Sequence, residues 1–146
     1  MAKILDTNSY LDTVCALLRE GHTHIPVTIA GTSMTPFLDP GDTVFLDLPG
    51  EPVKKGDVIL FARLGQKYVL HRVVHVFPDG TLELLGDAQI RSERIRPEDV
   101  RAIATGARRG TKLLNKNSLR WRFFRDVWVH IRRPRPYINR IRSHIK

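Results

Sequence analysis

The stretch KGDVILFARLGQKYVLHRVVHVF, residues 55–77, decides the fold class of this 146-residue chain. It contains two runs rich in β-branched and apolar residues, 57–63 and 67–77. Residues with turn chemistry, Lys55-Gly56-Asp57 and Gly65, stand before and between these runs. Short apolar runs bounded by turn signals are typical of neighbouring β-strands.

The same pattern continues on both sides of this stretch. Further strands are predicted at His24–Ala30, Thr43–Leu48, Thr81–Leu85 and Val100–Ala107. Pro40-Gly41-Asp42, Pro49-Gly50 and Pro78-Asp79-Gly80 separate them. Residues 8–20 have apolar positions at helical spacing, with Gly21 as a C-cap, and predict one amphipathic helix. The sequence therefore predicts a mainly β domain with an N-terminal helix.

The charge of the chain is concentrated at its C-terminal end. The formal net charge is +9, and residues 112–146 hold eleven Lys or Arg against one acid, Asp126. Within this region, residues 117–133 predict a basic amphipathic helix. Its apolar stripe consists of Leu119, Phe123, Phe124, Val127, Trp128 and Ile131. We therefore divide the chain into an N-terminal helix (1–22), a β domain (23–110) and a basic amphipathic tail (111–146).

Several classes of protein are excluded by composition. No apolar run is longer than the five residues of Val58–Ala62, which is far too short to cross a bilayer, and no signal peptide is recognisable. The single cysteine, Cys15, can form neither an internal disulfide nor a thiolate metal site, which favours a reducing, cytoplasmic location. The histidines lack the spacing of metal ligands, so we expect neither a metal nor a cofactor.

A series of short motifs follows the first predicted strand in a fixed order. It begins with Gly31-Thr32-Ser33-Met34-Thr35-Pro36 and continues with Gly41-Asp42. The later members are Gly56-Asp57-Val58-Ile59-Leu60-Phe61, His71-Arg72-Val73-Val74 and Gly86-Asp87-Ala88. Together they resemble the signal peptidase I family and its wider S24/S26 clan, which includes LexA-type repressors. The resemblance covers about residues 25–105 and implies a LexA/signal-peptidase-like β fold.

This resemblance implies a serine-peptidase site. Ser33 corresponds to the nucleophile, and His71 stands where the bacterial enzymes have a lysine base. A histidine base is similar to that of the endoplasmic-reticulum and sporulation-type signal peptidases, whose later Gly-Asp motif supplies a carboxylate, here Asp87. Glu93 is a second carboxylate candidate. The oxyanion would be bound by the Ser33 N–H, with Thr32 or another backbone donor assisting.

Imidazole suits the role of a base because it titrates near neutrality. We therefore expect activity to rise through an apparent pKa near 6 to 7. A structural interpretation stands beside each assignment. Ser33 has the surroundings of a turn hydroxyl, His71 those of a half-buried histidine on a strand, and Asp87 those of a turn residue.

The leading hypothesis is a serine endopeptidase that cleaves a peptide or protein precursor at the cytosolic face of a membrane. The alternative is a noncatalytic peptide- or protein-binding module with a peptidase fold. A self-cleaving LexA-like regulator is disfavoured, because about 24 residues before the first strand cannot form a helix-turn-helix domain. We expect residues 112–146 to bind an anionic membrane surface, with Trp121 as an interfacial anchor. The alternatives are nucleic acid and a helix packed on the β domain.

Overall fold

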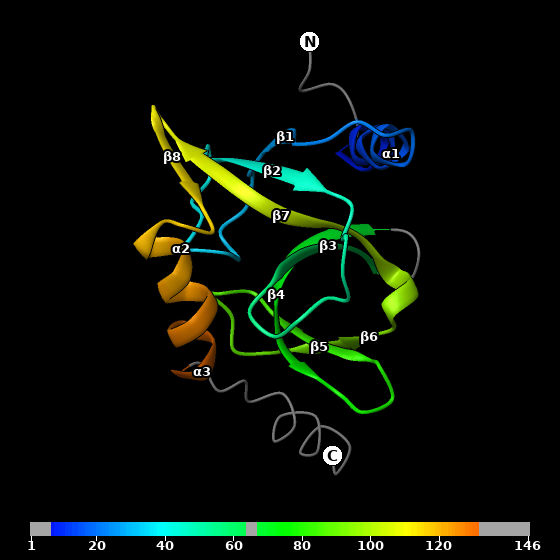
Figure 1. Cartoon of the computed structure of the whole chain (residues 1–146), viewed down its shortest axis with the longest axis vertical. Helices are drawn as coiled ribbons and strands as arrows, with labels where there is room; N and C mark the ends of the chain where they lie inside the picture. Colours follow the sequence, from blue (N-terminus) through cyan, green and yellow to red (C-terminus); the bar gives the residue numbers. More distant parts are fainter. Residues whose placement is uncertain (1–6, 64–66, 132–146) are drawn as a thin grey trace.

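An antiparallel sheet of eight strands dominates the computed structural model, which describes residues 7–63 and 67–131 (Figure 1). The strand order is β1-β2-β7-β3-β4-β5-β6, and β8 pairs with β7. The elements are α1 (Thr7–Arg19), β1 (Ile25–Thr28), β2 (Thr43–Asp47), β3 (Val58–Arg63), β4 (Lys67–Val76), β5 (Leu82–Leu85), β6 (Glu93–Ile95), the short helix η2 (Pro97–Asp99), β7 (Val100–Arg109), β8 (Lys112–Asn115), α2 (Leu119–Phe123), the π-helical segment η3 (Phe124–Trp128) and α3 (Val129–Ile131).

The mainly β fold class and the N-terminal helix are confirmed. Each predicted strand corresponds to an observed one, with boundaries that differ by two residues or fewer. Two short strands, β6 and β8, were not predicted. β6 has only three residues, two of them charged, and β8 lies in the basic segment that composition separated from the domain.

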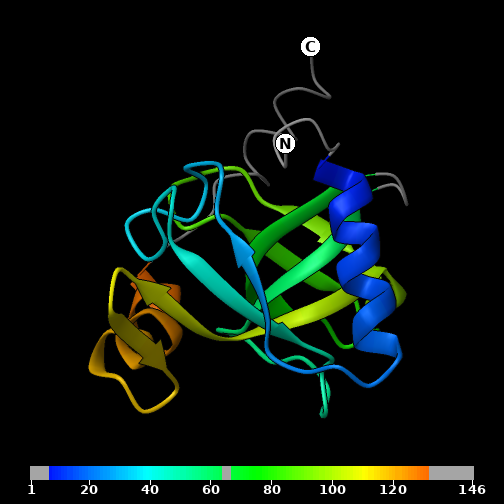
Figure 2. The same ribbon diagram turned by 90° about the horizontal axis from the view of Figure 1, so that it is seen from above.

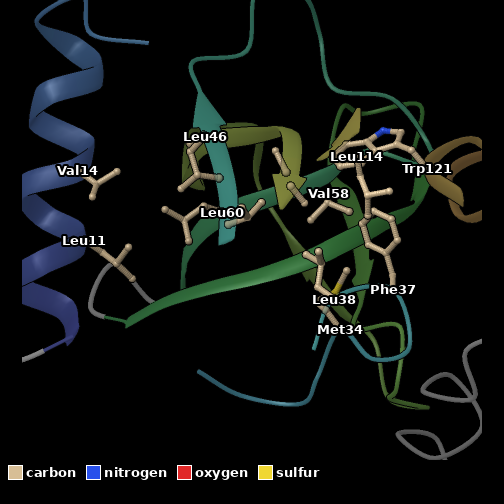
Figure 3. Close-up of a cluster of buried hydrophobic side chains, with 14 of the residues drawn as sticks. Leu11, Val14, Met34, Phe37, Leu38, Leu46, Val58, Leu60, Leu114 and Trp121 are labelled. Carbon is tan, nitrogen blue, oxygen red and sulfur yellow. The ribbon is translucent and has the colours of Figure 1, made fainter. Parts of the chain in front are cut away.

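The central strand β3 divides the core into two clusters because successive side chains of a strand point to opposite faces. Val58 and Leu60 join a large cluster with residues from α1, β2 and β7. Ile59 and Phe61 join a smaller cluster under β5 and β6. Figure 3 shows the larger cluster reaching from α1 on one side to the C-terminal helical segment on the other.

Local irregularities allow the sheet to curl around these clusters. The pairing register shifts where β7 has one extra residue opposite β2 and another opposite β3, and where β4 has one opposite β5. Such β-bulges bend a strand and increase its twist. As a result, α1 and the helical segment α2–α3 lie on opposite sides of the molecule (Figures 1 and 2). In the described part of the chain, no helix is both long and apolar enough to span a membrane.

The predicted boundary at residue 110 does not separate a tail from the body. β8 pairs with residues 106–109 of β7, and Leu114, Trp121 and Phe124 are buried in the large core cluster. Trp121 is 8% exposed and packs edge-on against Phe37, so the prediction of an interfacial anchor is wrong. The predicted stripe does not separate buried from exposed residues, because it includes Phe124, which is buried in the same cluster, and omits Trp121. Residues 132–146 of the predicted tail lie outside the described residues.

Candidate active site

A cavity of about 860 Å³ lies between α1, β1 and the first half of β4. Most of its lining side chains are apolar and come from α1, β1, β2, β3 and β4. Ser33 and His71, the predicted nucleophile and base, both line it. Two residues that are 38 positions apart in the sequence therefore line the same cavity.

Ser33 is half-buried on the turn between β1 and β2. Buried neighbours, Met34 and Phe37, anchor this turn in the large core cluster. The N–H of Ala88 donates a hydrogen bond to the Ser33 carbonyl at 2.9 Å, which joins the turn to the loop after β5. A Cβ at Gly86 would lie 2.6 Å from the same carbonyl oxygen, so only glycine permits this close approach.

His71 is 4% exposed in the middle of β4. Its ring centroid lies 5.9 Å from that of Phe61, and Nδ1 is buried without a hydrogen-bond partner among the described residues. Burial lowers the pKa of the imidazole to about 4; the Glu93 carboxylate opposes this effect, and the Arg63 guanidinium adds to it. His71 is therefore neutral at physiological pH. If His71 is the base, we therefore expect activity to rise at a lower pH than an ordinary imidazole pKa predicts.

The carboxylate of Glu93 lies within ion-pair distance of the imidazole of His71. Its Oε1 lies 3.9 Å from Nδ1 of His71. Glu93 belongs to β6 and also accepts two hydrogen bonds from Arg63, one from Nε at 2.9 Å and one from Nη2 at 2.5 Å. The second carboxylate candidate of the sequence therefore lies beside the predicted base.

Asp87 is held by a different partner. Arg72 donates from Nε to Oδ1 and from Nη2 to Oδ2, both at 2.8 Å, and both side chains are about 2% exposed. Arg72 also donates to the Gly56 carbonyl at 2.8 Å and lies over the Phe37 ring at 4.9 Å. The carboxylate of Asp87 therefore forms a bidentate pair with Arg72, and its predicted orienting role on His71 stays a prediction.

Sequence reasoning gave Arg72 no role in the site. Its guanidinium connects β4 to the loop beside Ser33 through Asp87, and to the Ser33 turn through Phe37. The available signal was an arginine between His71 and Val73, at the centre of a strand rich in Val and Leu, because a buried charge requires a partner. Arg72 and Asp87 thus hold in place the segments that carry Ser33 and His71.

The other predicted site features remain predictions. Thr32 is exposed, and its carbonyl accepts hydrogen bonds from the N–H and the hydroxyl of Thr35 at 3.1 and 3.0 Å. This arrangement tightens the turn but leaves the oxyanion role of Thr32 and of the Ser33 N–H to be tested. Within residues 7–63 and 67–131, no three His, Cys, Asp or Glu side chains are grouped as metal ligands.

Two strand edges border the cavity. β1 is the end strand of the sheet and pairs with β2 alone among the described strands. Residues 67–71 of β4 pair with β3, whereas the pairing of β4 with β5 begins at Arg72. Residues 27–30 and 67–71 both line the cavity, so its two walls present backbone edges to an extended segment.

The helix α1 makes hydrogen bonds to both of these edges. Oδ1 of Asn8 accepts a hydrogen bond from the Tyr68 N–H at 3.4 Å. The Tyr10 hydroxyl donates to the Pro26 carbonyl at 3.1 Å. The cavity is therefore a groove that α1 bounds at one end.

Comparison with protein families supports this description of the fold. The family model described as Peptidase S24-like matches residues 2–105, about 70% of the chain. The match begins before α1, so it is longer than the region from residue 25 that the sequence motifs indicated. No curated protein and no solved structure matches the chain significantly. A mainly β chain with this family match belongs to the Peptidase S24-like family, within the LexA/signal-peptidase superfamily.

Proposed function

We propose that this chain is a serine endopeptidase of the signal peptidase I type, with Ser33 as nucleophile and His71 as general base. The observation that carries the proposal is that both residues line one apolar groove, with the Glu93 carboxylate 3.9 Å from the imidazole Nδ1. A serine hydroxyl requires a neighbouring base to become a nucleophile, and a neutral imidazole is able to accept its proton.

The two imidazole nitrogens take separate tasks in this mechanism. Nδ1 carries the proton and donates it toward Glu93, which leaves Nε2 to accept the proton of Ser33. The Nδ1–Oε1 distance of 3.9 Å shortens to a hydrogen bond when substrate closes the groove. That contact stabilises the imidazolium and raises the pKa of His71, which strengthens the base at the step where it is needed.

The substrate is an extended peptide. It adds as a strand between the edge of β1 and residues 67–71 of β4, where main-chain hydrogen bonds hold it in register. Its apolar side chains contact Met34, Leu60 and Leu70 on the groove wall. The scissile carbonyl then reaches Ser33, and the adjacent backbone N–H donors stabilise the developing oxyanion.

A digest of a complex peptide library tests this function. The purified protein is expected to generate new peptide termini that share residue preferences around the cut, read by mass spectrometry. Ser33→Ala and His71→Gln are each expected to reduce cleavage about 10³-fold or more. Ser9→Ala, which changes an exposed serine of α1 outside the groove, is the matched control.

The outcome also separates the two function classes. Cleavage by wild type and by Ser33→Ala at equal rates refutes the nucleophile assignment. Peptides that bind the groove and remain uncut favour the noncatalytic module, in which a buried His71 packed on Phe61 is structural.

A further inference from the structure

The C-terminal helical segment has two apolar faces, and the domain covers one of them. Trp121, Phe124 and Val129 are buried against the body. Leu119, Phe123, Val127 and Ile131 follow one another at intervals of four residues along α2, η3 and α3, and all four side chains are exposed. These four side chains, here called the outer ridge, are between 43% and 78% exposed.

The outer ridge lies in the most basic region of the chain. Lys112, Lys116 and Arg122 are exposed on β8, the following turn and α2. Asp126, the only acid in residues 112–146, accepts two hydrogen bonds from Arg125 at 2.7 Å. The sequence beyond the described segment, 132–146, adds six Lys or Arg and no acid. The outer ridge therefore belongs to a part of the sequence, residues 112–146, in which eleven Lys or Arg stand against one acid.

We infer that the outer ridge docks this protein on an anionic membrane surface. Aliphatic and aromatic side chains with arginines beside them suit the boundary between headgroups and acyl chains. Each basic side chain near an anionic bilayer strengthens binding about fivefold. A second copy of this face would bring two strongly positive regions together, which like-charge repulsion disfavours. Nucleic acid matches the charge but offers nothing to cover four exposed apolar side chains.

This inference is independent of catalysis, because docking requires neither Ser33 nor His71. It also means that one apolar face of the helical segment contacts the domain and the other contacts lipid. The buried face, with Trp121 and Phe124, fixes the segment to the Ser33 turn through Phe37. The outer ridge then holds the folded body at the lipid surface.

Vesicle sedimentation tests the docking surface with the full chain. We expect binding to vesicles of phosphatidylcholine and phosphatidylglycerol, with weaker binding as salt rises. The double variant Phe123→Ser/Val127→Ser is expected to bind at least about tenfold more weakly. Leu48→Ser/Ile90→Ser removes two comparably exposed apolar side chains elsewhere on the domain, and it is expected to bind as wild type does.

Folding of the ridge variant is checked by its thermal unfolding, which is expected to match that of wild type because both positions are exposed. Equal vesicle binding by wild type and the folded ridge variant overturns the inference, as does equal binding to phosphatidylcholine alone. Two further results overturn it by assigning the ridge to another occupant. One is a dimer of wild type that the ridge variant does not form, and the other is ridge-dependent binding of duplex RNA or DNA without vesicle binding.

Discussion

His71 and Arg72 are neighbours on β4, but they meet their carboxylates in very different ways. Successive side chains of a strand point to opposite faces, so the two residues enter different parts of the core. Arg72 donates two hydrogen bonds of 2.8 Å to Asp87, and both side chains are buried. His71 lies 3.9 Å from Glu93 and has a buried Nδ1 without a hydrogen-bond partner in the described chain.

The comparison separates a fixed ion pair from an adjustable one. A buried donor left unpaired costs about 1–3 kcal/mol, so the His71 side is the less stable arrangement. Glu93 is also partly exposed and shared with Arg63, which lets its carboxylate move without breaking the core. We therefore expect changes on the Arg72 side to act on stability and changes on the His71 side to act on chemistry.

The largest effect on folding is expected from Asp87→Asn. The substitution keeps the size of the side chain but leaves the Arg72 guanidinium buried without a counter-charge, which costs about 3–5 kcal/mol of folding free energy. Urea unfolding measures the loss. Glu98→Gln is the control, because it removes a carboxylate from an exposed pair with Arg96 and is expected to cost less than about 1 kcal/mol. Similar losses of unfolding free energy in both variants would show that the buried pair stabilises the fold no more than the exposed pair does.

The contrast between these two pairs also marks how far the sequence could predict the site. Periodicity and turn residues located α1 and six strands, because those signals are local. Ordered motifs identified Ser33 and His71. The partner of each charged group depends on the sheet register and on the path of the loop after β5, which place Glu93 beside His71 and Asp87 beside Arg72. No local pattern distinguishes those two carboxylates.

The prediction that Trp121 lies outside the domain was wrong for a related reason. Amphipathic periodicity identifies an apolar face but not its covering. Composition placed Trp121 outside the domain, whereas Phe37 packs on its ring at 5.2 Å and buries it. A helix with two apolar faces, one buried and one exposed, gives a mixed pattern that a single stripe cannot represent.

Glu93→Gln is expected to produce the next largest effect, now on turnover. The amide cannot stabilise an imidazolium, so cleavage in the library assay should fall about 10²-fold, while stability changes by about 1 kcal/mol or less. Comparing kcat with KM for a peptide found in that library separates chemistry from binding. A variant with full turnover and reduced stability would reverse the assignment of the two carboxylates and make Glu93 a structural residue.

Acid should destabilise the protein through His71 by a smaller amount. The pKa is about 4 in the folded protein against 6.5 ordinarily, so the unfolded chain binds more protons between these values. The free energy of unfolding therefore decreases as the pH drops from about 6.5 to 4, and at pH 5 the loss of stability is about 2 kcal/mol. Unfolding of wild type and His71→Gln at pH 7.5 and 5 isolates this contribution. Parallel losses in the two proteins would contradict the lowered pKa.

The smallest effects are expected from the charges beside the imidazole, and they test the difference between His71 and Arg72 most directly. Arg63 lowers the pKa of His71 and Glu93 raises it, so Arg63→Gln should raise that pKa and Glu93→Gln should lower it further. NMR titration of the His71 ring gives both values. Lys67→Gln serves as the control, because Lys67 lines the same groove but is not among the charges that act on His71. Shifts in the same direction for Arg63→Gln and Glu93→Gln would show that their shared ion pair, rather than either charge alone, sets the environment of the base.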